Sequence, residues 1–222
     1  MSRESPKQAM FGQFAAVAKA AAHPLRLELL EQLAQGERSI EVLADRARVP
    51  IANASQHLQQ MRRAGLVAAR RDGRYVYCRL ADDAVLDLVA ALRRVAEAQS
   101  AEVERVVRSY FADRDALEPV TRAELAERLK DGLVTVLDVR PADEFALGHV
   151  PGAVNVPLDQ LERRLASLDP GHEIVAYCRG PYCVLSYEAV AALRARGFRA
   201  RRLEDGLPEW RAAGLPTETG GR

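Results

Sequence analysis

Apolar positions in the first 64 residues recur every three to four residues, the spacing of short amphipathic helices. Pro24 suits a first helical turn and Ser39 suits an N-cap, so each marks the start of a helix. In the last of these helices Ala54, Leu58 and Met61 share one face. The helices predicted here cover residues 11–21, 24–35, 40–47 and 51–64.

Between residues 66 and 80 the spacing of apolar side chains changes to every second position, which predicts two short strands joined at Asp72-Gly73. In the second strand Cys78 alternates with Val76 and Leu80, so we expect a buried thiol rather than a sensing one. One long helix is then predicted from residue 82 or 83 to about residue 111. Its apolar stripe needs a partner surface, which favours a homodimer.

Strand and helix signals alternate in the second half of the chain, after a polar stretch that ends at Pro119. The strands expected are 134–139, 174–177 and 200–203, and the helices are 158–168 and 184–196, with a helix that opens at the capping box Thr121-x-x-Glu124. Such alternation predicts an α/β domain with a mostly parallel sheet flanked by helices. The domains predicted are 1–113, mainly α-helical, a linker at 114–118, and 119–222, of α/β class.

Composition adds little about location and more about partners. The 222 residues are 48% hydrophobic and 28% charged with a net charge of +1, and the apolar runs are too short to span a bilayer. The first residues lack the apolar core of a signal peptide, and three cysteines do not make a disulfide framework, so a cytoplasmic protein without a membrane partner is expected. Residues 39–79 hold eight basic and three acidic side chains, a local excess that suggests an anionic partner.

The basic block overlaps a run of two short helices, a proline turn, a third helix and a basic hairpin, an order typical of a winged helix-turn-helix. With one face of helix 51–64 buried, its other face presents amide and hydroxyl groups that can read base edges. Arginines at the helix end and around the hairpin suit phosphate contacts with double-stranded DNA. The DNA-binding candidates are Asn53, Ser55, Gln56, His57, Gln59, Arg62, Arg63, Arg70, Arg71 and Arg74, with Gln60 on the same face.

Four motifs in this half resemble the ArsR-type transcriptional regulators: His-Pro-Leu-Arg at 23–26, Ala-Asn-Ala-Ser-Gln-His-Leu at 52–58, Arg-Ala-Gly-Leu-Val at 63–67, and Arg-Asp-Gly-Arg-Tyr-Val-Tyr at 71–77. The resemblance implies a homodimer that binds an inverted-repeat operator and usually represses. Metal-sensing members commonly carry Cys-x-Cys in the helix before the recognition helix, and residues 39–45 contain no thiol. Because the four histidines also lie in unrelated contexts, we expect neither a metal site nor a cofactor.

The segment Tyr-Cys-Arg-Gly-Pro-Tyr-Cys at 177–183 lies between a predicted buried strand and a predicted helix. Cys178 is therefore expected at the strand end, facing backbone N–H groups and the positive end of a helix dipole. That environment lowers a thiol pKa and holds an anion, which suits sulfur or phosphate chemistry. The active-site loop expected around Cys178 comprises Arg179, Gly180, Pro181, Tyr182 and Cys183.

The motifs Val-Leu-Asp-Val-Arg at 136–140, Glu144 to Pro157, Tyr177-Cys178, Gly206 and Trp210 resemble the rhodanese, or sulfurtransferase, domain. The resemblance implies sulfane-sulfur transfer through a persulfide on Cys178, from a donor such as thiosulfate or a persulfide. Related phosphatases need an arginine six positions after the cysteine, where this chain has Val184. Asp138, Arg140, Glu144 and His149 are interpreted as scaffold residues.

Two departures from the rhodanese pattern concern the loop. Pro181 removes one N–H donor, and Cys183 stands where a hydroxyl side chain is common. Cys183 either resolves a modified Cys178 as a disulfide or bridged polysulfide, or is a small buried residue at the start of the helix. Arg179 is expected to help an anionic donor dock.

Three hypotheses follow. The leading one is a DNA-binding repressor whose rhodanese domain senses sulfane sulfur or thiol oxidants through Cys178, with the long helix after residue 82 as the coupling route. The second is an active thiosulfate or persulfide sulfurtransferase with an attached DNA-binding domain. The third is a regulator whose rhodanese domain only docks a sulfur-carrier protein.

Overall fold

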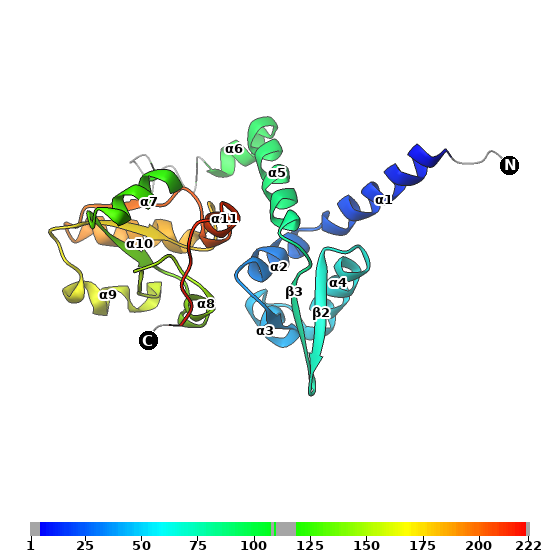
Figure 1. Ribbon diagram of the computed structural model, residues 1–222, viewed down its shortest axis with the longest axis horizontal. Helices are drawn as coiled ribbons and strands as arrows, with labels where there is room; N and C mark the ends of the chain where they lie inside the picture. The colour runs from blue at the N-terminus through cyan, green and yellow to red at the C-terminus, as the bar shows by residue number, and fades with distance from the viewer. Residues whose placement is uncertain (1–4, 108, 110–118, 221–222) are drawn as a thin grey trace. The chain divides into compact units, whose positions relative to one another are not determined.

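The chain forms two compact units, Met1–Ala90 and Ala91–Arg222, which a computed structural model describes for residues 5–107, 109 and 119–220 (Figure 1). The predicted linker at 114–118 lies outside the described residues. None of the described helices combines the length and the hydropathy needed to cross a membrane.

The first unit holds the four helices and the hairpin that the apolar spacing predicts. The first helix, α1 (Pro6–Ala21), begins earlier than predicted because Ser5 and Gln8 form a reciprocal capping box before its apolar stripe starts. Ser39 caps α3 as expected. The remaining elements are α2 (Pro24–Ala34), β1 (Arg38–Ser39), α3 (Ile40–Arg46), α4 (Ile51–Arg63), β2 (Val67–Asp72) and β3 (Tyr75–Leu80).

Strands β1, β3 and β2 form an antiparallel sheet in that order. Asp72 pairs directly with Tyr75, so the two turn residues are Gly73 and Arg74, one position later than predicted. Gly73 has φ 58°, a left-handed conformation that a side chain would disfavour. The turn therefore places Arg74 at the tip of the hairpin.

One apolar core fixes the orientation of α4. Leu29, Leu43 and Met61 are completely buried, and Leu58 and Cys78 belong to the same cluster. Fully burying such a side chain stabilises the fold by about 1.5–3 kcal/mol relative to leaving it exposed. The opposite face of α4 is thereby left toward solvent.

The prediction of one continuous helix after residue 82 is wrong within the described residues. The chain forms α5 (Ala84–Gln99) and then α6 (Ala101–Val107). Ser100 lies between them, and its hydroxyl accepts a hydrogen bond from the Val103 N–H at 3.3 Å, so it acts as the cap of α6. The predicted end at residues 110–111 falls outside the described residues.

The second unit is built on a parallel sheet of order β5-β4-β6-β7, the arrangement expected from the alternating signals. Its short elements β5, α8 and α11 were not predicted, because a two-residue strand and six-residue helices of less than two turns hold too little periodicity to detect. The predicted helix 158–168 is broken into two 3₁₀ turns around the four residues of α9. The elements are α7 (Arg122–Lys130), β4 (Val134–Asp138), α8 (Ala142–Leu147), β5 (Val154–Asn155), α9 (Leu161–Arg164), β6 (Glu173–Tyr177), α10 (Val184–Ala195), β7 (Ala200–Arg202) and α11 (Leu207–Ala212).

Alternate residues of β6 enter the cores on opposite faces of the sheet. Ile174 and Ala176 join a cluster that includes residues of α9 and α10, and Val175 and Tyr177 join a cluster with residues of α7 and α11. Every one of these four side chains is completely buried. A strand covered on both faces holds the residue that follows it, Cys178, in one position.

Candidate DNA-binding surface and cysteine site

The outward face of α4 carries side chains predicted to read bases and others predicted to contact phosphate. Gln56, Gln59, Arg62 and Arg63 are exposed, and Asn53 is half-buried. Among the described residues, neither Arg62 nor Arg63 has a hydrogen-bonding or ion-pair partner. These guanidinium groups therefore keep their full capacity to bind phosphate.

His57 differs from the other predicted α4 residues because its ring packs inward. The ring centroid lies 4.5 Å from that of His23, and its Nδ1 atom is buried with no hydrogen-bond partner in the described part of the protein. Burial and the charges of His23 and Arg26 lower the pKa of His57. This geometry suits His57 to packing between α2 and α4 better than to contacting DNA bases.

The wing arginines are bound to different degrees. Arg70 makes a bidentate ion pair with Glu37 and a single ion-pair contact with Asp72. Both carboxylates raise the pKa of Arg70. Arg71 donates to the Gly73 carbonyl, and Arg74 stacks on Tyr75. Glu37 neutralises the charge of Arg70. Of the three wing arginines, Arg71 and Arg74 are therefore better placed to bind phosphate.

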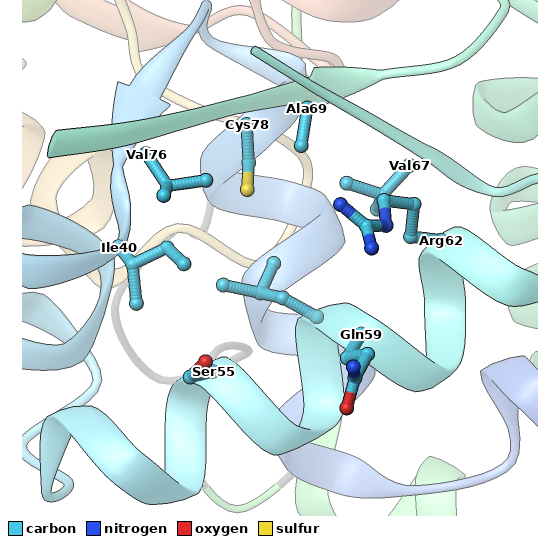
Figure 2. Close-up of a pocket in the computed structure, with 9 residues that line it drawn as sticks. Ile40, Ser55, Gln59, Arg62, Val67, Ala69, Val76 and Cys78 are labelled. Atoms are coloured by element: carbon cyan, nitrogen blue, oxygen red, sulfur yellow. The ribbon is translucent and has the colours of Figure 1, made fainter. Parts of the chain in front are cut away.

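A cavity of about 200 Å³ lies between α4 and the wing sheet (Figure 2). Figure 2 shows Cys78 reaching from β3 toward the α4 side chains, among them Ser55 and Gln59. The Cys78 side chain is buried, which raises its pKa to about 11. The thiol therefore stays protonated near neutral pH. Its burial is as the strand pattern predicts, and it also lines the cavity.

Cys178 follows directly after β6 and Cys183 directly precedes α10, as predicted. Their sulfur atoms are joined by a disulfide, with the two Cα atoms 6.1 Å apart, within the usual range for this bond. Both residues are nearly inaccessible to solvent. Cys183 occupies the N-cap position of α10 without a capping hydrogen bond from its side chain, so its sulfur serves the disulfide.

The loop offers fewer backbone donors to an anion than its position suggests. Pro181 has no N–H group, and the Cys183 N–H donates to the Gly180 carbonyl at 3.1 Å. Arg179 makes a bidentate ion pair with Glu144, whose side chain is completely buried. The expectation that the Arg179 charge helps an anionic donor dock is therefore weakened.

A buried polar network holds the strand ends beneath the loop. Arg140 makes a bidentate pair with Asp138 and donates to the Gly148 carbonyl at 2.7 Å. The Tyr177 hydroxyl donates to Asp138 and accepts from the Val150 N–H. Burial and the Asp138 carboxylate raise the pKa of Tyr177 well above its usual value, so the phenol remains a donor. Asp138 and Arg140 thus have the scaffold geometry that the sequence predicts.

Gly206 allows α11 to approach the cysteine loop. A Cβ atom at this position would overlap the Arg179 carbonyl group and the Gly180 nitrogen. The Leu207 N–H also donates to the Cys178 carbonyl at 3.3 Å. Only glycine fits here, which explains the glycine in the motif that was singled out from the sequence.

Inside the second unit, two polar contacts connect the site to the C-terminal part of α5. The Tyr182 hydroxyl donates to Glu97 at 2.7 Å, and burial together with this carboxylate raises the pKa of Tyr182. Glu209 accepts from the Gly206 N–H with one carboxylate oxygen and pairs with Arg93 through the other, at 3.3 Å.

Sequence reasoning missed Glu37, Glu97 and Glu209 because Arg70, Tyr182 and Arg93, with which they pair, are distant from them in sequence. Glu144 was recognised only as a scaffold residue. In the described residues no group of three or more His, Cys, Asp or Glu side chains is arranged to hold a metal ion.

Comparison with known proteins agrees with both halves of this geometry. Residues 21–70 match the model of a helix-turn-helix domain, and residues 121–213 match that of the rhodanese-like domain. The chain is 43% identical to the HTH-type transcriptional regulator Rv0324 of Mycobacterium tuberculosis, over 96% of this chain and 94% of that protein.

The chain belongs to the ArsR-type transcriptional regulators that carry a rhodanese-like domain.

Two further relatives of this regulator match one half each. A sulfurtransferase of Allochromatium vinosum is 33% identical over 41% of this chain and 86% of its own length. The solved homodimeric winged helix-turn-helix DNA-binding domain of Mb0332 from Mycobacterium bovis is 37% identical, covering 46% of this chain and 94% of that one, with a TM-score of 0.42.

Gly206→Ala is expected to displace the cysteine loop, because the added methyl group meets rigid backbone. We expect the second unit to lose about 1–3 kcal/mol of unfolding free energy and the reduced protein to form its disulfide more slowly. Denaturant unfolding followed by Trp210 fluorescence measures the first effect. Gly148→Ala is the matched control, since its Cβ would make only ordinary contacts at 3.9 Å. Equal stability of the two variants would contradict the assignment.

Proposed function

We propose that this regulator is a homodimeric, DNA-binding repressor whose rhodanese-like domain senses sulfane sulfur through Cys178, with Cys183 as the resolving thiol. The observation that carries the proposal is the Cys178–Cys183 disulfide across the active-site loop. A sulfur atom taken up by Cys178 is within reach of a second thiol, and a five-residue separation lets the pair close without large movement elsewhere.

The chemistry needs no oxidant besides the sulfur donor. The Cys178 thiolate attacks the outer sulfur of a persulfide, RSSH; the donor's S–S bond breaks, and its electron pair leaves with RS⁻, which is released as the thiol RSH. The Cys183 thiolate then attacks the inner sulfur of the Cys178 persulfide, and HS⁻ leaves. One RSSH and two protein thiols yield RSH, H₂S and the disulfide, so the donor is reduced while the protein is oxidised.

The DNA-binding role is supported by the exposed polar face of α4 and by Arg62 and Arg63 at its end, which have no hydrogen-bonding or ion-pair partner among the described residues. The homodimer is supported by apolar side chains left exposed on helices, and by the homodimeric state of the related M. bovis domain. The exposed apolar residues are Met10, Phe11 and Phe14 on α1, Leu92 and Val95 on α5, and Val106 on α6.

The coupling route in this proposal runs through α5. Tyr182 lies inside the loop that the disulfide closes, and its hydroxyl donates a hydrogen bond to Glu97. Glu209 connects Gly206, which touches the loop backbone, to Arg93. Since α5 spans residues 84–99 without interruption, it continues into the first unit. A loop that changes shape on disulfide formation therefore acts directly on a helix shared with the DNA-binding unit.

An active sulfurtransferase is the second candidate function. The similarity to the A. vinosum sulfurtransferase favours it. The near-complete burial of Cys178 and the presence of a resolving cysteine favour a switch that reacts once over an enzyme with many turnovers.

Gln56→Ala is expected to reduce the preference for operator over random DNA, because an exposed amide on the recognition helix reads base edges. Arg71→Ala is expected to weaken binding to both DNAs alike. The slope of log affinity against log salt concentration should become shallower by about one. Fluorescence anisotropy at several salt concentrations measures both, on an operator selected from random duplexes with the reduced protein. Arg163→Ala, an exposed arginine of the second unit, is the control. Identical losses for Gln56→Ala and Arg71→Ala on both DNAs would refute the assignment.

Persulfide treatment of the reduced protein is expected to weaken operator binding at fixed salt by about tenfold or more, a coupling free energy of about 1.4 kcal/mol. Cys178→Ser should abolish the response. Cys78→Ser should leave it unchanged, because the Cys78 thiol with a pKa of about 11 carries little thiolate. Intact mass on the same samples identifies which cysteines react.

Equal operator affinity for reduced, sulfur-treated and Cys178→Ser protein would rule the sensing proposal out. Steady sulfur transfer from thiosulfate to cyanide, without any change in DNA affinity, would instead support the sulfurtransferase.

Tyr182→Phe is expected to leave disulfide formation intact and to reduce the change in operator affinity that follows it. A hydrogen bond to a charged group contributes about 1.5–3 kcal/mol, so the affinity ratio between the two states should fall at least about threefold. Glu97→Gln should act in the same direction. In the double variant the affinity ratio should fall by no more than in either single variant. Glu102→Gln, which affects an exposed pair with Arg105, is the control. An unchanged affinity ratio in both single variants would exclude this route.

A further inference from the structure

An apolar groove of about 500 Å³ lies in the second unit at the carboxyl end of β4. This volume is within the range of pockets that bind small organic ligands. Most of its lining consists of aliphatic side chains and prolines, and its polar members are Asp159 and Gln160. The apolar lining residues are Val139, Pro141, Ala142, Pro157, Leu158 and Leu185.

The groove shares a wall with the cysteine pair. Val139, Cys178 and Cys183 belong to one buried cluster, against which Leu158 and Leu185 pack. The Val139 N–H donates to the carbonyl of Tyr177, the residue before Cys178, at 3.2 Å. Val139, Leu158 and Leu185 thus belong both to the lining of the groove and to the apolar cluster around the cysteine pair.

The charges around the groove disfavour an anion. None of the residues that line it is basic, and Asp159 places an exposed carboxylate on its rim. The nearby Arg179 is neutralised by the buried Glu144 carboxylate. Pro181 and the internally bonded Cys183 N–H further reduce the donors available to a charged group. A thiosulfate dianion gains little from such a surface, whereas an uncharged alkyl group gains by leaving water.

We propose that this groove binds the alkyl body of an organic persulfide and delivers its outer sulfur to Cys178. The inference rests on the proposed sulfur-sensing function and adds its substrate class. The reaction is the transfer given above: the donor's S–S bond breaks, a new S–S bond forms on Cys178, and the alkyl thiol leaves with the electron pair and takes a proton. The groove then releases the thiol, and Cys183 displaces HS⁻ from the modified Cys178.

The test compares ethyl, butyl and hexyl persulfide, glutathione persulfide and thiosulfate as donors to the reduced full-length protein. Time-resolved intact mass measures the rate of sulfur uptake and of disulfide formation. The rate constant should rise at least about tenfold from the ethyl to the hexyl donor, because each added methylene is removed from water in the groove. Glutathione persulfide and thiosulfate should both react more slowly than hexyl persulfide.

Two variants place the effect in the groove. Ala142→Asp adds a carboxylate to its lining and should reduce the hexyl rate at least about tenfold, whereas Ala146→Asp, exposed on the same helix but outside the groove, should not. Asp159→Lys should raise the thiosulfate rate and leave the hexyl rate nearly unchanged. Trp210 fluorescence and circular dichroism establish that each variant is folded.

The outcomes separate this inference from the proposed function. Sulfur uptake at the same rate for every alkyl length, faster uptake from glutathione persulfide, or equal losses in Ala142→Asp and Ala146→Asp would overturn the groove assignment and leave sensing by Cys178 intact. Failure of every donor to modify Cys178 would overturn the proposed function itself.

Discussion

The Asp138–Arg140 ion pair holds the cysteine site in place. Both side chains are completely buried, and removing two charges from water is costly unless other groups satisfy them. Here Tyr177, the Gly148 carbonyl and a bidentate contact do so. The pair joins the ends of β4 and β6 and the chain after α8. Because Cys178 is the next residue after Tyr177, its position follows from this network, and the two-sided burial of β6 prevents it from shifting.

The protein uses arginine in two opposite ways. At the cysteine loop, the Arg179 guanidinium is bound to a buried carboxylate and stabilises the loop at the expense of its own capacity to attract anions. At the end of α4, Arg62 and Arg63 have no such partner in the described residues and face solvent. The first arrangement leaves little charge for an incoming anion, and the second leaves guanidinium groups that can bind phosphate. The residue type is the same, and the neighbouring carboxylate decides between the roles.

Elements with several turns or a strong local signal were predictable. Helix α4, the hairpin, and the β6–loop–α10 segment follow from apolar spacing, turn residues and caps, and the structure places them within one or two residues. The continuous helix after residue 82 was wrong because the Ser100 hydroxyl makes a local hydrogen bond that competes with helix continuation. The two-residue strand β5 and the six-residue helix α11 are too short to show the period of a strand or a helix, so they depend on tertiary packing.

The sequence by itself determined the two domain types, the place of Cys178 between a strand and a helix, and the apolar face of α4, because each is recorded in the pattern of residues close together in the chain. Only the tertiary structure decided which arginine charges are left to bind an anion. Arg70 meets Glu37 and Arg179 meets Glu144, pairs separated by 33 and 35 residues. It also decided that Cys183 meets Cys178 and that Gly206 touches the loop. Such contacts form only when a complete core brings distant segments together, and no local pattern records them.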